Sequence, residues 1–325
     1  MTTAQRRVNP FVIPGREDAP RSVLCPWREP NHTELYVEID NYAPAFREFK
    51  DQFASPQLLK EACRLALVGG ESGCGKSALR NMCAHWLQEE LGKVGLRGEI
   101  FDLAKETDAL NQGLDSAVID IKARMGRVCS SLLKKLATGD FIDGSVRDDL
   151  LGTAADAPHE VYAELAAAMA DKDQEDVVPI LLLPATDMRL EMERYLQMPG
   201  SRIVFFAEAV MSTNELSHIG AGQNADMPPA TVSVGTLSPA DVQLFITTRT
   251  EQRRKDCAFP SLHEELVEYL AAWPNTTVAG LQSHLTGVYD HARRTFTNYT
   301  NDTTITKGDM TDYTMNLIDN LRARR

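Results

Sequence analysis

The chain has 325 residues, of which 43% are hydrophobic and 25% charged, a composition typical of a globular protein with a substantial core. Its formal net charge of -12 argues against a broad nucleic-acid-binding surface, and two arginine-rich stretches, 249–255 and 322–325, stay open as local basic patches or solvated helix faces. The sequence contains neither an apolar run of about 18 residues nor a signal-peptide core, so we expect a cytoplasmic protein without a membrane segment.

Six cysteines are spread along the chain, and none forms a CxxC pair or has a histidine at metal-ligand spacing. In a chain of this length the pattern indicates reduced thiols and not a disulfide framework. Cys74 lies inside a glycine-rich stretch, where a thiol reagent would interfere with ligand binding.

The first 34 residues are rich in proline, arginine and asparagine and have no periodic pattern. They fit an extended arm and a disordered segment equally well. A short strand is expected at 34–39, and helices are expected at 43–53 and 56–63.

A short apolar strand is expected at 65–68, and a glycine-rich loop follows that matches G-x-x-x-x-G-K-[ST] from Gly70 to Ser77. A helical pattern with one apolar face begins directly after the loop and runs to Leu91. Strand, loop and helix therefore stand in the order that a phosphate-binding loop requires.

Each residue type in this loop has a physical reason. Glycines adopt backbone conformations that other residues avoid, and they bring N–H groups close to phosphate oxygens at the start of a helix. Lys76 is expected to reach the β- and γ-phosphates, and Ser77 to ligate Mg²⁺. The expected nucleotide-binding residues are Gly70, Glu71, Ser72, Gly73, Cys74, Gly75, Lys76, Ser77 and Ala78. We therefore predict that the protein binds a nucleoside triphosphate.

Strands and helices alternate after the loop helix. The expected strands are 98–103, 177–183, 203–206 and 231–234, and the expected helices lie within 110–136, 161–169 and 188–197. A loop with at most short helices is expected at 138–158, and a loop at 211–230. This order predicts a three-layer α/β fold, in which helices cover both faces of a mostly parallel sheet.

The last part of the chain reads as helices separated by turns. These helices are expected at 240–255, 262–272, 276–296 and 310–323. Ser238 is the expected N-cap of the first one, with Pro239 at its first position and Asp241 returning the cap. We therefore expect an N-terminal arm at 1–34, a P-loop nucleotide-binding domain at 35–236 and an α-helical lid domain at 237–325.

The order of these elements resembles the AAA+ and STAND branches of the P-loop ATPases from about residue 40 to about residue 300. The Walker A loop at 70–77 is the specific match, because the other matches rest on order and spacing. The resemblance implies ATP and Mg²⁺ as cofactors, self-association, and a protein client.

The resemblance also places a Walker B segment at Ile180 to Met188, which departs from the family pattern. Pro184 stands in place of the first Asp, Asp187 matches the second, and Met188 replaces the Glu. Asp187 is expected to reach Mg²⁺ through water or to cap the next helix, and the two roles are compatible. Glu191, one helical turn on, is the expected substitute for the catalytic carboxylate.

The strand at 203–206 resembles the sensor strand of these ATPases, and Glu208 stands where a polar residue or an arginine is usual. Three roles for Glu208 stay open: orienting water, replacing the Walker B carboxylate, or ending the strand. Ala279 occupies the position of the sensor 2 arginine. The arginines that could act as arginine fingers are Arg189, Arg194 and Arg202, and each also fits a surface ion pair.

These departures predict tight nucleotide binding with slow or absent hydrolysis, so that the nucleotide acts as a switch. The expected catalytic residues are Lys76, Asp187, Glu191 and Glu208, and the expected metal ligands are Ser77 and Asp187. The alternatives are a scaffold that holds a structural nucleotide, and a DNA-directed helper ATPase, which the acidic charge disfavours.

Two further enzyme classes fit less well. A GTPase would read guanine with N/T-K-x-D, and Thr306-Lys307-Gly308-Asp309 matches these letters, but the segment follows a polar stretch and the lid helices. A small-molecule kinase would use Asp102 beside the phosphate loop, but the helical C-terminal part fits an ATPase lid better.

Overall fold

A computed structural model provides the structure, and the residues that it describes are 6–16, 22–39, 42–106, 121–186, 188–198, 202–211, 215, 218–219, 228–254 and 257–323. The chain forms two compact units. The first unit comprises Met1–Ala43, Ser72–Gly75 and Gly235–Arg325, and the second comprises Pro44–Glu71 and Lys76–Val234. No helix among the described residues combines the length and the apolar character that crossing a membrane needs.

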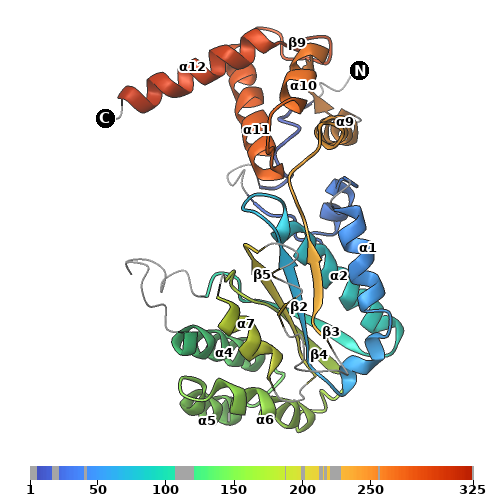
Figure 1. Ribbon diagram of the computed structural model, residues 1–325, viewed down its shortest axis with the longest axis vertical. Coiled ribbons are helices and arrows are strands. Elements are labelled where there is room, and N and C mark those ends of the chain that lie inside the picture. Colours follow the sequence, from blue (N-terminus) through green and yellow to red (C-terminus); the bar gives the residue numbers. More distant parts are fainter. Residues whose placement is uncertain are drawn as a thin grey trace. The chain divides into compact units, whose positions relative to one another are not determined.

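The second unit is built on a five-stranded parallel sheet (Figure 1). Its strands are β2 (Arg64–Gly69), β3 (Arg97–Asp102), β4 (Val177–Leu182), β5 (Val204–Ala209) and β6 (Ala230–Ser233), in the order β3-β4-β5-β2-β6. Because β5 pairs with both β2 and β4, the carboxyl ends of these three strands meet at one edge of the sheet. Val68 in β2 is aligned there with Glu208 in β5.

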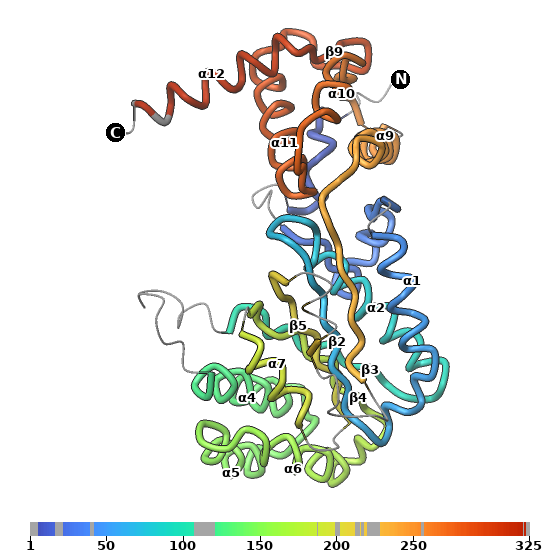
Figure 2. The backbone as a smooth tube through the Cα atoms, in the orientation of Figure 1, coloured from blue at the N-terminus to red at the C-terminus, as the bar shows by residue number. Residues whose placement is uncertain are grey.

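Helices cover both faces of the sheet, as Figures 1 and 2 show. The helices on one face are α1 (Ala43–Gln52) and α2 (Lys76–Lys93), and those on the other are α4 (Ile121–Thr138), α5 (Gly144–Ala154), α6 (Pro158–Ala170) and α7 (Arg189–Leu196). Leu67 and Phe205 join the buried cluster of the second face, whereas Phe206 contacts Phe49 of α1. The three-layer α/β fold expected from the sequence is therefore confirmed.

The first unit is mostly helical. Its helices are α9 (Pro239–Arg254), α10 (Glu264–Ala271), α11 (Val278–Thr295) and α12 (Lys307–Ala323), and its two-residue strands are β7 (Cys257–Ala258), β8 (Ser261–Leu262) and β9 (Thr304–Ile305). The expected cap of α9 is present, because Ser238 N donates to Asp241 Oδ2 at 2.9 Å and Asp241 N donates to Ser238 Oγ at 3.2 Å. The helical C-terminal part predicted from the sequence is thus present.

Residues near the N-terminus belong to this helical unit. Strand β1 (Arg6–Arg7) pairs in parallel with β7, and Asn9 Nδ2 donates to the carbonyl of Thr286 in α11 at 2.8 Å. Phe11 is only 2% exposed and packs against Phe245 and Tyr289. The segment from Arg6 to Phe11 therefore contributes to the core of the helical unit.

The structure differs from the sequence-based expectation in two places. The strand at 34–39 is replaced by a 3-10 helix, η1 (Pro30–Leu35), and an extended segment. Residues 138–158, expected to form a loop with at most short helices, contain the 11-residue helix α5, because Leu150 and Ala154, one turn apart, are buried in the core. The expected helix within 110–136 is seen from Ile121 onward as α4, and residues 107–120 lie outside the described part of the chain.

Candidate nucleotide-binding site

Three glycines shape the loop between β2 and α2. Gly70, Gly73 and Gly75 have φ angles of +137°, +85° and +96°, a region that residues with a Cβ atom rarely adopt. A Cβ atom on Gly70 would lie 2.2 Å from the carbonyl oxygen of Val234. The loop therefore requires glycine both for its backbone angles and, at Gly70, for space.

Lys76 begins α2, and its side chain folds back over the loop. Its ammonium group donates hydrogen bonds to the carbonyl oxygens of Gly70 at 2.7 Å and Glu71 at 2.8 Å. Only 8% of Lys76 is exposed. The positive charge is thus held against the loop, where a phosphate group can replace the two carbonyl oxygens as its partner.

The tip of the loop, Ser72–Gly75, belongs to the helical unit and contacts the first turn of α11 there. Ala279 N donates to the carbonyl of Gly73 at 3.0 Å. A Cβ atom on Gly73 would lie 2.9 Å from the hydroxyl of Thr277, which caps α11. Ala279, which stands in the sensor 2 position, thus contacts the loop through its backbone.

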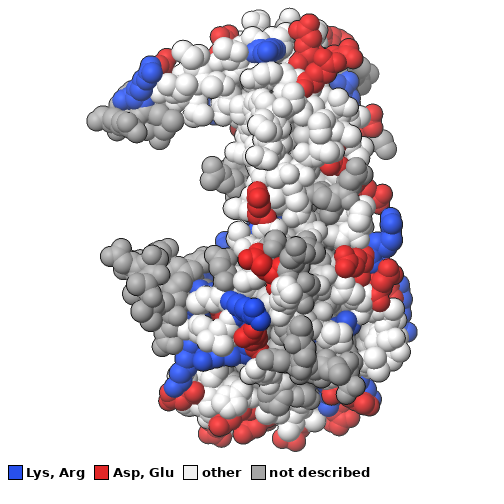
Figure 3. Space-filling model, in the orientation of Figure 1, with Lys and Arg blue, Asp and Glu red and all other residues white. Residues whose placement is uncertain are grey.

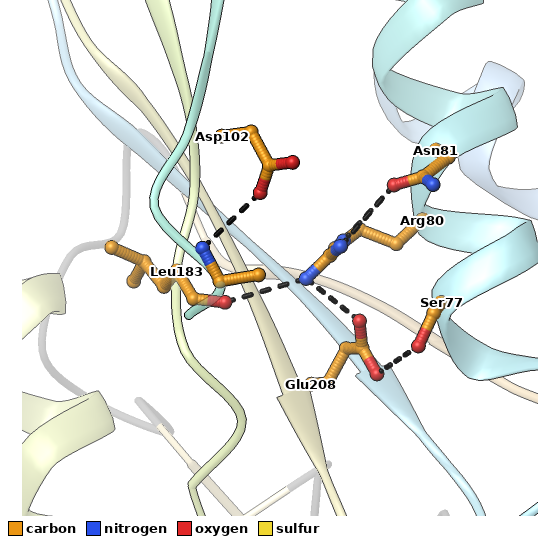
Figure 4. Close-up of polar contacts among 7 residues, drawn as sticks. Ser77, Arg80, Asn81, Asp102, Leu183 and Glu208 are labelled. Atoms are coloured by element: carbon orange, nitrogen blue, oxygen red, sulfur yellow. Dashed lines mark hydrogen bonds and ion pairs between the residues drawn. The ribbon is translucent and has the colours of Figure 1, made fainter. Parts of the chain in front are cut away.

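Ser77 and Glu208 meet at the edge of the sheet, and Figure 4 shows their contacts. The Ser77 hydroxyl donates to Glu208 Oε2 at 2.8 Å. The second oxygen, Oε1, lies 2.7 Å from the guanidinium nitrogen NH1 of Arg80 in α2. One carboxylate from β5 therefore binds two side chains of the loop helix.

Arg80 also links α2 to Leu183, the residue that follows β4. Its NH1 donates to the carbonyl of Leu183 at 3.3 Å, and its NH2 donates to Asn81 Oδ1 at 3.2 Å (Figure 4). Asp102, which a small-molecule kinase would use beside the phosphate loop, accepts a hydrogen bond from Ala104 N at 3.2 Å. This contact gives Asp102 a turn-forming role at the end of β3.

Glu191 takes part in a buried network of its own. Its Oε2 accepts from Arg124 Nε at 3.1 Å and from the Thr186 hydroxyl at 2.7 Å, and Arg124 NH2 also donates to the carbonyl of Ala185 at 3.1 Å. The side chains of Arg124 and Glu191 are 3% and 2% exposed. The network holds the segment that follows β4, the expected Walker B segment. Asp187 lies in this segment but outside the described residues.

The structure thus brings Lys76, Ser77 and Glu208 to one loop, and it gives Glu191 partners in α4 and in the segment after β4. Arg80 and Arg124 were not predicted from the sequence. The signal for Arg80 was its spacing, because it follows Ser77 by three residues and so lies on the same side of α2. No comparable local signal pointed to Arg124.

Other predicted positions have structural explanations. Arg189 pairs with Glu193 at 2.7 Å on the same helix, and Arg202 donates to the carbonyl of Glu175. The residues that resemble a guanine-reading motif start α12, where Thr306 N donates to Asp309 Oδ2 at 2.7 Å. The four letters T-K-G-D are therefore a helix cap.

The donor set near Ser77 fits a magnesium ion. Because the Ser77 hydroxyl gives its hydrogen to Glu208, the lone pairs of its oxygen stay available to a cation. The described residues contain no group of three or more His, Cys, Asp or Glu side chains arranged for a metal. Mg²⁺ would therefore depend on phosphate oxygens and water for most of its ligands, as is usual for this ion.

No protein-family profile matches the sequence, and no curated protein is significantly similar to it. Among solved structures, the Aeropyrum pernix ORC1 protein, in complex with DNA, is similar with a TM-score of 0.55 and 13% identity over 87% of this chain and 67% of ORC1. The Aeropyrum pernix ORC2 protein, in complexes with ADPNP and ADP, has a TM-score of 0.55 and 11% identity over 85% of this chain and 68% of ORC2. These similarities show the fold, which is the AAA+ P-loop fold.

Proposed function

We propose that the protein binds ATP in the loop between β2 and α2 and acts as a nucleotide-dependent switch with slow hydrolysis. The observation that carries this proposal is the loop geometry: three glycines with positive φ and Lys76 Nζ directed at the loop carbonyls. The AAA+ P-loop fold supports it. The STAND branch remains a second subtype that fits the same elements.

Lys76 is proposed to bind the β- and γ-phosphates, and the N–H groups of 70–78 to surround them. Ser77 would ligate Mg²⁺, which supplies positive charge to the phosphates when bound. Glu208 is proposed to take the place of the Walker B carboxylate, because it accepts the Ser77 hydrogen bond. Asp187 is kept as an outer ligand of the metal, and Glu191 is proposed to position its segment through Arg124.

Slow hydrolysis follows from the contacts of the carboxylates. A general base needs a carboxylate that is free to accept a proton from water. Glu208 is engaged by Ser77 and Arg80, and Glu191 is engaged by Arg124 and Thr186. We therefore expect binding to be strong relative to turnover.

The proposed switch uses the hydrogen bond between Gly73 and Ala279. A phosphate that rearranges the loop would change this contact, so that nucleotide binding alters the start of α11. We propose that this change controls self-association and the binding of a cytoplasmic protein client. The DNA complex of ORC1 supports a DNA-directed role as the alternative, which the net charge of -12 disfavours.

The test is to replace Lys76 with Ala and to titrate ATP and GTP with Mg²⁺, followed by phosphate release. Because a charged hydrogen bond contributes about 1.5–3 kcal/mol, we expect ATP affinity to fall roughly 10- to 100-fold. Lys93→Ala is the matched control, since Lys93 ends the same helix and its side chain is 67% exposed. Absence of binding by the wild-type protein would contradict the proposal, and binding without phosphate release would favour the scaffold alternative.

A further inference from the structure

Arg80 is buried beside the phosphate loop and has no counterpart in the Walker A pattern. It follows Lys76 by four residues, so the two cationic side chains lie on neighbouring turns of α2. The side chains of Arg80 and Glu208 are 6% and 8% exposed, and their closest charged atoms are 2.7 Å apart. Arg80 therefore supplies a positive counter-charge to Glu208, the carboxylate that binds Ser77.

This counter-charge matters because of where Glu208 lies. A carboxylate next to a triphosphate repels it, and the repulsion is strong in a poorly hydrated site. A divalent cation between carboxylate and phosphate removes the repulsion. In this protein a guanidinium fixed by Leu183 O and Asn81 Oδ1 already neutralises Glu208.

We propose that Arg80 is a built-in counter-cation that makes nucleotide binding by this loop largely independent of Mg²⁺. The inference rests on the proposed nucleotide binding. Arg80 acts through Glu208 and is thus a positioning residue: its positive charge offsets the carboxylate, and its contact with Leu183 fixes the distance between α2 and β4. The ligand class is a nucleoside di- or triphosphate, bound with or without a divalent cation.

The experiment measures the dissociation constant of ADP with Mg²⁺ and again with EDTA, for the full chain and its variants. For the wild-type protein we expect the two constants to differ by less than about fivefold. In Arg80→Gln the carboxylate is left unbalanced, so ADP should bind at least ~10-fold more weakly in EDTA, and Mg²⁺ should restore much of the affinity. Arg80→Lys keeps the charge and should behave more like the wild type.

Glu208→Gln provides a second test that does not remove Arg80. Without the negative charge, ADP should bind as tightly in EDTA as in Mg²⁺, or more tightly. Arg64→Gln is the control for loss of a half-buried arginine, because Arg64 begins β2, at the opposite end of the strand from the loop. For Arg64→Gln, the ratio of the ADP dissociation constants in EDTA and in Mg²⁺ should equal that of the wild type.

Three results separate the outcomes. A wild-type protein that binds ADP with Mg²⁺ and loses more than about fivefold of this affinity in EDTA would overturn the inference while supporting the proposed function. Equal ratios for wild type and Arg80→Gln would overturn it too, since Arg80 would then be purely structural. If the wild-type protein binds ADP under neither condition, the proposed function itself fails, and the inference fails with it.

Discussion

Gly70 is the residue at which the loop tolerates least change. Alanine there would place a Cβ atom 2.2 Å from Val234 O and would have to keep a φ of +137°. Strain of this kind costs of order 1–3 kcal/mol. We expect Gly70→Ala to lower the free energy of unfolding by roughly this amount and to weaken ATP binding at least ~10-fold. Urea unfolding and an ATP titration measure the two effects.

Gly92→Ala is the matched control for Gly70→Ala. Gly92 lies within α2, and a Cβ atom there would meet nothing within 4 Å. Alanine in a helix is favoured over glycine by about 0.5–1 kcal/mol, so this variant should be slightly more stable and bind ATP normally. If both variants bind ATP like the wild type, the loop geometry is not what holds the nucleotide.

At the scale of residues, the sequence predicts the features that depend on neighbouring residues and not those that depend on distant ones. The loop was predictable because Gly70 to Ser77 are consecutive and each residue type has a local reason. The contact between Ser77 and Glu208 joins residues that are 131 positions apart. Only the position of β5 beside β2 makes this contact, so the sequence left three roles for Glu208 open. The spacing of Arg80 from Ser77 was a local signal, but its partners Glu208 and Leu183 are distant in the sequence and could not be predicted from it.

At the scale of elements, the segment around Phe11 is expected to stabilise the helical unit. The ring centroid of Phe11 lies 5.4 Å from that of Tyr289 in α11 and 6.2 Å from that of Phe245 in α9. Replacing a buried Phe with Ala typically costs 3–5 kcal/mol, so roughly this loss is expected for Phe11→Ala. Hydrogen exchange should then show lower protection in α9 and α11 and unchanged protection in β2, β4 and β5.

Val23→Ala is the control, because Val23 belongs to the same N-terminal part of the chain but is 40% exposed. Its effect should stay within about 0.5 kcal/mol, as for most surface substitutions. Unchanged protection of α9 and α11 in Phe11→Ala would mean that the N-terminal segment is dispensable for the helical unit.

The wrong strand at 34–39 shows the limit of pattern reasoning at this scale. Leu35, Val37 and Ile39 are buried and the residues between them are more exposed, which is the alternation of a half-buried strand. Alternation reports burial on one side, and it does not supply a neighbouring strand. The central strands β2, β4 and β5 were predicted correctly because they are buried along almost their whole length and are bounded by loops.

At the scale of the whole molecule, the charge distribution argues against the DNA-directed alternative. The chain carries a formal net charge of -12, which repels the phosphate groups of DNA. On the face shown in Figure 3, acidic side chains gather over the part of the helical unit that carries α10 and β9. Of the arginine-rich stretch 249–255, Arg249 is only 5% exposed, and burial lowers its pKa to about 10. This arginine cannot reach a phosphate backbone.

We therefore expect weak DNA binding with a shallow dependence on salt. Each phosphate contact contributes about -0.9 to the slope of log K against log salt concentration, so a slope no steeper than about -2 is expected. The measurement is a titration of duplex DNA, with and without ATP, at two salt concentrations. Arg254→Glu removes an exposed charge at the end of α9, and Arg147→Glu in α5 is its control. A slope near -6 that only Arg254→Glu makes shallower would contradict this expectation and favour the DNA-directed role, because it would place several phosphate contacts on the helical unit.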